Sequence, residues 1–130
     1  MRASYFDPLN AVSVETDVES AEDLKSLLDQ ISALTTSRGR PTLELLRDDG
    51  SSLALSSDGR LGFLVFTNSL GESFHSSGGK PGRRLIFDYF GSWSEAPSEA
   101  LIAFSEAFRS AVEFLREGTP ETEAVLFEPD

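Results

Sequence analysis

The segment Gly71-Glu-Ser-Phe-His75 places a serine two residues before the single histidine of this 130-residue chain. A serine near a histidine base is typical of nucleophilic hydrolases, whose serine stands between glycines on a strained strand-to-helix turn. Here the final glycine is missing, and His75 lies in a Gly- and Ser-rich stretch that would hold a base poorly. We therefore predict no catalytic residue in this segment.

The segment Ser77-Gly-Gly-Lys80 suggests a second chemistry, phosphate binding. A phosphate loop needs glycines at fixed positions and a Ser or Thr after the lysine to hold magnesium. The first glycine is misplaced here, and Pro81 stands where the hydroxyl is required. The alternative that remains is a small anion-binding patch formed by Lys80, Arg83 and Arg84.

Metal and cofactor chemistry have little support in the composition. The chain has no cysteine, which removes disulfides and thiolate nucleophiles, and one histidine, which argues against zinc or iron. The aspartates before Gly50 and Gly59 are typical of turns rather than of calcium sites. With 22 acidic residues, no single pair of carboxylates is informative about acid–base catalysis. We predict no cofactor, no metal and no enzyme activity.

The stretch from Arg84 to Pro97 is where the sequence most favours a binding role. Residues 84–90 predict a strand that is buried on both faces, because apolar side chains lie on each side of it. Asp88 stands among these bulky neighbours, and two interpretations of it remain open. It is either a functional acid or, as we favour, a structural carboxylate that accepts hydrogen bonds from loop amides.

Trp93, the only tryptophan, follows this strand on a predicted loop that leads to a helix. Tryptophan is enriched at protein interfaces because it covers a large area and keeps one hydrogen-bond donor. Trp93 therefore predicts a contact surface, and the alternative is a lid over the edge of the core.

Two amphipathic helices are predicted on either side of the strand-rich middle of the chain. The first runs over about 20–35, with Ser20 as its N-cap and acids in its first turn. The second runs over 97–117, with Pro97 in its first position and Gly118 as its C-cap. Their apolar stripes are Leu24, Leu27, Leu28, Ile31 and Leu34 in the first helix and Leu101, Phe104, Phe108, Ala111, Val112 and Leu115 in the second.

The expected architecture is a single α+β domain over residues 1–130, with both helices packed on one face of a mostly antiparallel sheet of about six strands. The strands are expected at 11–16, 41–47, 53–55, 60–67, 84–90 and 124–128, in the order β-α-β-β-β-β-α-β. Asp58-Gly59 predicts a hairpin, and strands 60–67 and 84–90 are expected side by side. Residues 1–10 are expected to be loosely ordered, and residues 68–83 to form a long mobile loop. The predicted buried residues are Leu28, Ile31, Leu64, Phe66, Phe87, Phe104 and Phe108.

The formal charge of −11 is unevenly distributed. Residues 1–30 carry seven acids against two bases and residues 88–130 carry ten against two, whereas residues 37–84 are mildly basic. This balance argues against nucleic acid as a partner and favours a basic protein, although a merely solvated surface is the simpler interpretation. The sequence has no apolar run long enough to span a membrane and no apolar signal region at its start, so we expect a cytoplasmic protein without membrane contact.

The C-terminal half of the chain resembles the immunity-protein family called type one. The resemblance rests on the run Leu85-Ile-Phe-Asp-Tyr-Phe-Gly91, on Glu95-Ala-Pro97, and on a helix that ends Ala111-Val-Glu-Phe-Leu-Arg-Glu-Gly118 before Pro120 and a short strand. It covers most of residues 11–128, and its distinctive part is residues 85–120. Members of this family are cytoplasmic antitoxins of bacterial polymorphic toxin systems, often encoded beside toxins with a deaminase-type domain.

The resemblance implies an immunity protein that neutralises a cognate toxin, a nucleic-acid or nucleotide deaminase with a basic surface, by tight stoichiometric binding. The toxin-binding candidates are Trp93 and Glu95 after strand 84–90, and Glu72 and Phe74 on the loop before it. The alternatives are an acidic adaptor or chaperone of a secretion system and an enzyme that uses Asp88 or His75. A toxin gene beside this one would favour the first hypothesis.

Overall fold

A large antiparallel sheet dominates the structure, a computed structural model that describes residues 1–78 and 83–130. In chain order the elements are β1 (Arg2–Asp7), β2 (Val12–Asp17), α1 (Ala21–Ser32), β3 (Arg40–Pro41), β4 (Leu43–Leu46), β5 (Ser52–Ser57), β6 (Leu61–Thr67), β7 (Ser73–Ser77), β8 (Ile86–Tyr89), β9 (Ser92–Glu95), a 3-10 turn (Ser98–Ala100), β10 (Ile102–Ala103), α2 (Phe104–Glu117) and β11 (Leu126–Pro129). The large sheet has the order β11-β7-β6-β5-β4-β1-β2, with β10 paired to β6, and a second sheet has the order β3-β8-β9.

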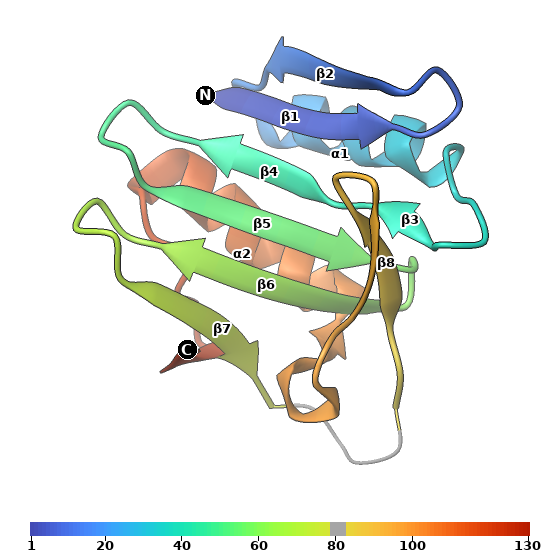
Figure 1. The fold of residues 1–130 in the computed structure, drawn as a ribbon. Coiled ribbons are helices and arrows are strands. Elements are labelled where there is room, and N and C mark those ends of the chain that lie inside the picture. The colour runs from blue at the N-terminus through green and yellow to red at the C-terminus, as the bar shows by residue number, and fades with distance from the viewer. Residues whose placement is uncertain (79–82) are drawn as a thin grey trace.

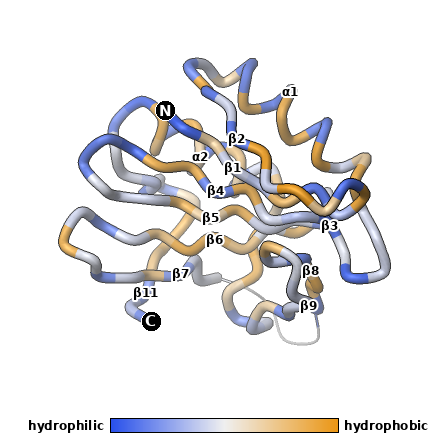
Figure 2. Tube along the Cα trace, turned by 45° about the horizontal axis from the view of Figure 1, so that its top comes forward, coloured by the Kyte–Doolittle hydropathy of each residue, from blue (hydrophilic) through white to orange (hydrophobic). Residues whose placement is uncertain are grey.

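The two helices cover one face of the large sheet, and the small sheet lies on the other. In Figure 1, α1 and α2 lie behind the large sheet while β8 crosses in front of it. Figure 2 shows α1 and the β8–β9 pair on opposite sides of the sheet. The α+β class and the mostly antiparallel sheet are as predicted. The described residues form eleven strands, however, compared with about six predicted, and β1, β3, β7, β9 and β10 are additional.

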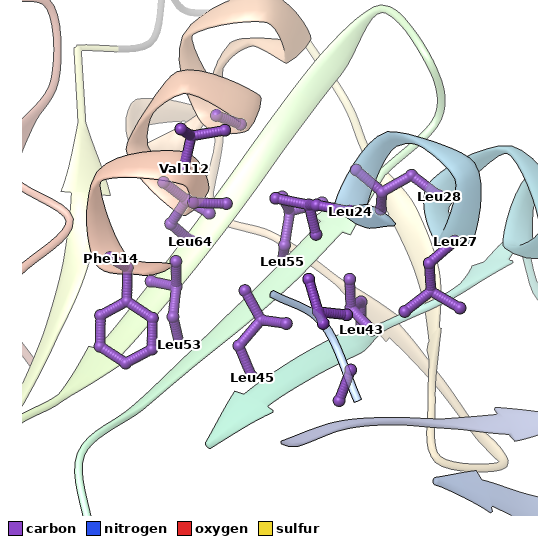
Figure 3. Close-up of a cluster of buried hydrophobic side chains, with 14 of the residues drawn as sticks. Leu24, Leu27, Leu28, Leu43, Leu45, Leu53, Leu55, Leu64, Val112 and Phe114 are labelled. Atoms are coloured by element: carbon purple, nitrogen blue, oxygen red, sulfur yellow. The ribbon is translucent and has the colours of Figure 1, made fainter. Parts of the chain in front are cut away.

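The main core fills the space between the helices and the inner face of the sheet (Figure 3). Side chains of successive strands point to it at every second position, as the pleat requires. The sheet contributes Leu43, Leu45, Leu53, Leu55 and Leu64, each no more than 1% exposed, and the helices contribute Leu24, Leu27, Leu28, Ile31, Ala107, Ala111, Val112 and Phe114. Burying one such leucine contributes about 1.5–3 kcal/mol.

Seven residues were predicted to be buried, and the structure differs only in degree. Leu28, Ile31, Leu64 and Phe87 are buried. Phe66, Phe104 and Phe108 are half-buried and pack against the main core.

The first helix begins where the sequence predicts. The Ser20 hydroxyl accepts the backbone N–H of Asp23 at 3.1 Å, and the Asp23 carboxylate accepts the N–H of Glu19 at 3.1 Å. These bonds satisfy donors that a helix start otherwise leaves without partners. The helix ends at Ser32, slightly before the predicted end at about residue 35.

The second helix begins at Phe104, and the prediction of a start at 97 was wrong. Residues 98–100 form a 3-10 turn, and Ile102–Ala103 pairs with Gly62 and Leu61 of β6. Leu101 and Ile102, which follow the 3-10 turn, pack into different cores: Leu101 packs with the small sheet and Ile102 with the main core. An extended backbone sends neighbouring side chains to opposite sides, which a helix could not do here.

The prediction that residues 1–10 are loosely ordered was also wrong. β1 pairs with β2 on one side and with β4 on the other. Ala3 and Tyr5 point into the main core, while Ser4 between them points away from it. This segment is therefore ordered by backbone hydrogen bonds to strands on both sides, although few of its residues are apolar.

The predicted loop 68–83 contains a strand, β7, which pairs with β6 and β11. Its buried Ser76 accepts the N–H of Leu64 at 3.1 Å and donates to the carbonyl of Ala100 at 2.7 Å. A serine can thus be buried within a strand when its hydroxyl is hydrogen-bonded. The rest of the predicted loop includes residues 79–82, and with them Lys80 of the predicted anion patch, which lie outside the described residues.

Strands 60–67 and 84–90 were predicted to pair side by side, and this was wrong. β8 pairs antiparallel with β9 and parallel with β3, not with β6. It instead packs across β6 through side chains, and the rings of Phe63 and Phe87 lie 5.9 Å apart between centroids. Leu85, Phe87, Ala96 and Leu101 form a second, smaller core there.

Among the described residues, no helix is long and apolar enough to cross a membrane.

Candidate binding site

The β8–β9 hairpin is reversed by a tight turn at Phe90 and Gly91. Both residues have positive φ, 49° and 95°, which is the requirement of the two-residue turn that best fits the twist of paired strands. The Asp88 carboxylate accepts the N–H of Gly91 at 2.7 Å through Oδ1. Asp88 is fully buried and therefore fixes the turn from below.

The second oxygen of Asp88 also has a partner. Its Oδ2 lies 3.3 Å from the Nε of Arg38, whose side chain is 41% exposed. The carbonyl of Asp88 accepts the N–H of Thr42 at 2.9 Å, next to the β3–β8 pairing. Both carboxylate oxygens are thus satisfied within the chain, which supports a structural role for this acid.

The hairpin presents different side chains on its two faces. Phe87 and Ser94 are paired in register and face the large sheet. Trp93 pairs with Asp88 and therefore lies on the opposite face of the hairpin. Trp93 is 52% exposed and belongs to neither core, which disagrees with its interpretation as a lid.

Between the hairpin and the open face of the large sheet lies a groove of about 220 Å³. Its walls include the aromatic rings of Phe63, Phe87 and Tyr89, and its floor is built from small side chains of β5 and β6. The remaining lining residues are Glu44, Ser52, Ala54, Ser56, Val65, Thr67 and Ser94. Tyr89 is still 46% exposed, so the ring borders both the groove and solvent.

The same open face carries carboxylates in a row that crosses the sheet. Strand register aligns Glu15, Ser4, Glu44, Ala54, Val65, His75 and Glu128 across successive strands. Because alternate residues share a face, this row lies on the side away from the helices. The negative charge of the chain is therefore present on this face as well as on the helices.

The four predicted contact residues divide into two groups. Trp93 and Glu95 share β9, and the Glu95 carboxylate pairs with Arg84, a member of the predicted anion patch. Glu72 lies in the β6–β7 turn, where it accepts a hydrogen bond from Asn68 at 3.0 Å. Phe74 points to the helix side and stacks on Phe66, with ring centroids 6.2 Å apart. Figure 1 places the β6–β7 turn at the other end of the sheet from β8.

His75 is engaged at the edge of the sheet rather than with Ser73. Its Nδ1 lies 2.7 Å from the Asp130 carboxylate, and its Nε2 lies 4.0 Å from that of Glu128. The hydroxyl of Ser73 bonds with that of Thr67 at 3.0 Å. These contacts tie β11 and the chain end to β7.

Sequence reasoning missed the groove residues, above all Glu44. The alternation Ser52, Ala54, Ser56 was a signal for a strand face with small side chains, but no local pattern shows that a distant hairpin closes over it.

The comparisons with known proteins give one result. The family model described as "Immunity protein Imm1" matches residues 13–126. The matched segment includes both helices and the hairpin with its groove. No curated protein matches the chain.

Proposed function

The chain belongs to the Imm1 family of immunity proteins, and we propose that it neutralises one cognate toxin by tight stoichiometric binding, without turnover of its own. The family match over residues 13–126 is the observation that carries this proposal. A mechanism by binding is supported by the hairpin, which holds an exposed tryptophan on a rigid frame. Rigid aromatic anchors are the residues that contribute most to binding at protein interfaces.

We propose further that the toxin is a deaminase that acts on nucleic acid or nucleotides in the cytoplasm, where this protein would meet it. An enzyme with a polyanionic substrate needs a basic cleft, and a protein of charge −11 is attracted to such a surface. The acidic row across the open sheet face would lie against that cleft in place of phosphates. Charge of this kind mainly accelerates association and makes it dependent on salt.

Co-expression tests the proposal. The toxin domain encoded beside this gene should arrest growth when expressed alone, and this protein should restore growth. The purified pair should elute as one complex of fixed stoichiometry in size-exclusion chromatography. If a folded variant that no longer binds the toxin still restored growth, neutralisation by binding would be the wrong mechanism. If co-expression did not restore growth and this protein instead bound a component of a secretion system, the adaptor hypothesis would be favoured.

A further inference from the structure

Glu44 stands in the groove with no side-chain partner among the residues that the structure describes. It lies on β4, aligned with Ser4 on one side and Ala54 on the other, and it is half-buried. Within residues 1–78 and 83–130, none of the ion pairs or side-chain hydrogen bonds involves its carboxylate. Arg2, one row further along the same face, makes no ion pair with it. The groove thus contains a carboxylate that no side chain in the described part of the protein neutralises.

The surroundings of Glu44 define what can bind there. Glu44 is the only carboxylate among the lining residues, which otherwise contribute aromatic rings, hydroxyls and small apolar groups. The volume of about 220 Å³ is smaller than the roughly 300–1,000 Å³ of typical small-molecule sites. A single long side chain fits this space better than a substrate or cofactor does.

A protein that covers this face must also provide a cation. Removing water from Glu44 without a replacement partner would leave a buried unpaired charge, which is strongly unfavourable. A guanidinium satisfies a carboxylate with two parallel hydrogen bonds and stacks on aromatic rings at the same time. An ammonium group pairs with a carboxylate as a point charge and lacks both the planar fork of donors and the planar stacking surface.

We propose that this groove binds an arginine side chain from the basic surface of the toxin, with Glu44 as its ion-pair partner and Tyr89 and Phe87 as its aromatic walls. The inference rests on the proposed function, because it names the contact by which the same toxin is held. The small residues Ser52, Ser56 and Thr67 form part of the floor, and Ser94 lies beside Phe87 on the hairpin.

The test compares Glu44→Gln with Glu117→Gln, which removes the same charge from an exposed position on α2. The probe is the toxin domain encoded beside this gene. Glu44→Gln should weaken binding by about 10-fold or more, the effect of losing a charge-assisted hydrogen bond, while Glu117→Gln should change it by less than about 3-fold. Tyr89→Ala should also weaken binding, and Tyr89→Phe should retain it. Thermal melting of the free Glu44→Gln and Glu117→Gln proteins must match the wild type, since within residues 1–78 and 83–130 the Glu44 carboxylate makes no ion pair or side-chain hydrogen bond.

A charge exchange makes the assignment specific. Glu44→Arg should abolish binding, and one Arg→Glu variant of the toxin should restore it. Equal effects of Glu44→Gln and Glu117→Gln on a complex that the wild type does form would overturn the groove assignment and leave the proposed function standing. Failure of the wild type to bind the toxin would overturn both.

Discussion

The carboxylate of Asp88 accepts the backbone N–H of Gly91, with 2.7 Å between Oδ1 and N. This bond connects a fully buried acid to the tip of the hairpin that displays Trp93 and Tyr89. Tyr89 and Ser92, on either side of the turn, are paired in register, so the bond holds both strands of the hairpin in place. The position of the proposed binding residues therefore depends on a group that does not itself reach the surface.

Asp88→Ala should lower the free energy of unfolding by about 1–3 kcal/mol, because it removes the partner of the Gly91 N–H and of Arg38. Asp88→Asn should cost less, since the amide oxygen can still accept the Gly91 N–H. Arg38→Gln should cost least, because the exposed side of that ion pair is screened by water. Chemical denaturation of the three variants measures this order, and equal losses for alanine and asparagine would mean that the turn bond contributes nothing.

Gly62 is required for space and not for backbone conformation. Unlike the other glycines that the structure describes, it has no positive φ. A Cβ at this position would lie 2.6 Å from the Cβ of Ala107 on α2. Gly62→Ala should therefore force α2 away from β6 and cost about 1–3 kcal/mol of stability.

A double mutant tests this explanation. Ala107→Gly alone should cost about 1 kcal/mol through the lower helix propensity of glycine. Combined with Gly62→Ala, it restores room for one methyl group, so the total loss should be smaller than the sum of the two single losses. Additive losses would show that the close approach is not what makes Gly62 necessary.

The parts of the fold that could be predicted are set by neighbouring residues. The N-cap Ser20 and the leucine spacing indicate α1, and Asp58-Gly59 marks the turn between β5 and β6, where the Asp58 carboxylate accepts the N–H groups of Arg60 and Leu61. The resemblance of residues 85–120 likewise indicated the family that the match over residues 13–126 shows.

The parts that failed depend on distant contacts. The face of strand 84–90 that carries Leu85 and Phe87 is apolar because it packs across β6, and from the sequence alone this resembles burial inside one sheet. A phenylalanine at positive φ gave no turn signal, so Trp93 was placed on a loop instead of on β9. Ser76 is stabilised in its strand by a hydrogen bond to Ala100, 24 residues away. The residues next to β8, Phe90 and Ser76 in the sequence give no sign of these distant contacts.

Asp49 should contribute to the pH dependence of stability. Hydrogen bonds to its carboxylate lower its pKa from the ordinary value of 3.8, chiefly the bond from the hydroxyl of Ser51 and then that from the Ser51 N–H. A lowered pKa means that the folded state favours the charged form, so this stabilisation is present above pH 3.8 and is lost as the pH falls through the lower folded value. Asp49→Asn should be less stable than the wild type at pH 7, and the difference should shrink near pH 3.

Asp48→Asn is the control for this comparison. It removes the same charge from the neighbouring exposed position and leaves the hydrogen bonds between Asp49 and Ser51 in place. Denaturation midpoints at pH 7 and pH 3 decide the matter, and a gap between wild type and Asp49→Asn that widened toward low pH would contradict the assigned sign.

Trp93 and Glu95 should affect toxin binding in different ways. Trp93→Ala should cost about 2 kcal/mol or more of binding, through faster dissociation, if the ring is buried near the centre of the interface. Glu95→Gln should mainly slow association at low salt, because rim charges act on encounter. Surface plasmon resonance separates the two rates, and unchanged melting temperatures must accompany both variants.

The same measurement shows how far the interface extends. Glu72 can contact the toxin together with the hairpin only if the toxin spans the open face as far as the β6–β7 turn, whereas Phe74 points to the helix side and lies away from that face. If Glu72→Gln slowed association as much as Glu95→Gln does, the contact would extend across the face. A much smaller effect of Glu72→Gln would confine the contact to the hairpin. A Trp93→Ala protein that binds normally but melts several degrees lower would assign the ring to structure instead.

Phe90 combines strain with partial exposure at the tip of the hairpin. Its φ of 49° is a conformation that costs most residues about 1–2 kcal/mol, whereas asparagine tolerates it. The ring packs edge-on against Tyr89, with centroids 5.1 Å apart, and such a pair contributes about 0.5–1.5 kcal/mol. These two effects oppose each other, so Phe90→Asn should change the free energy of unfolding by less than about 1 kcal/mol in either direction.

Toxin binding should nevertheless suffer. A strained aromatic residue that adds little to stability is expected where its side chain serves a partner, because strain persists mainly at functional positions. Phe90→Asn should therefore weaken the toxin complex by faster dissociation, and Phe90→Tyr, which keeps the ring, should bind as the wild type does. Denaturation and binding kinetics of the two variants give the answer together. If Phe90→Asn lowered the free energy of unfolding by more than about 2 kcal/mol and left the dissociation rate unaltered, the ring would support the fold instead. Such a loss would exceed what the aromatic pair alone can supply.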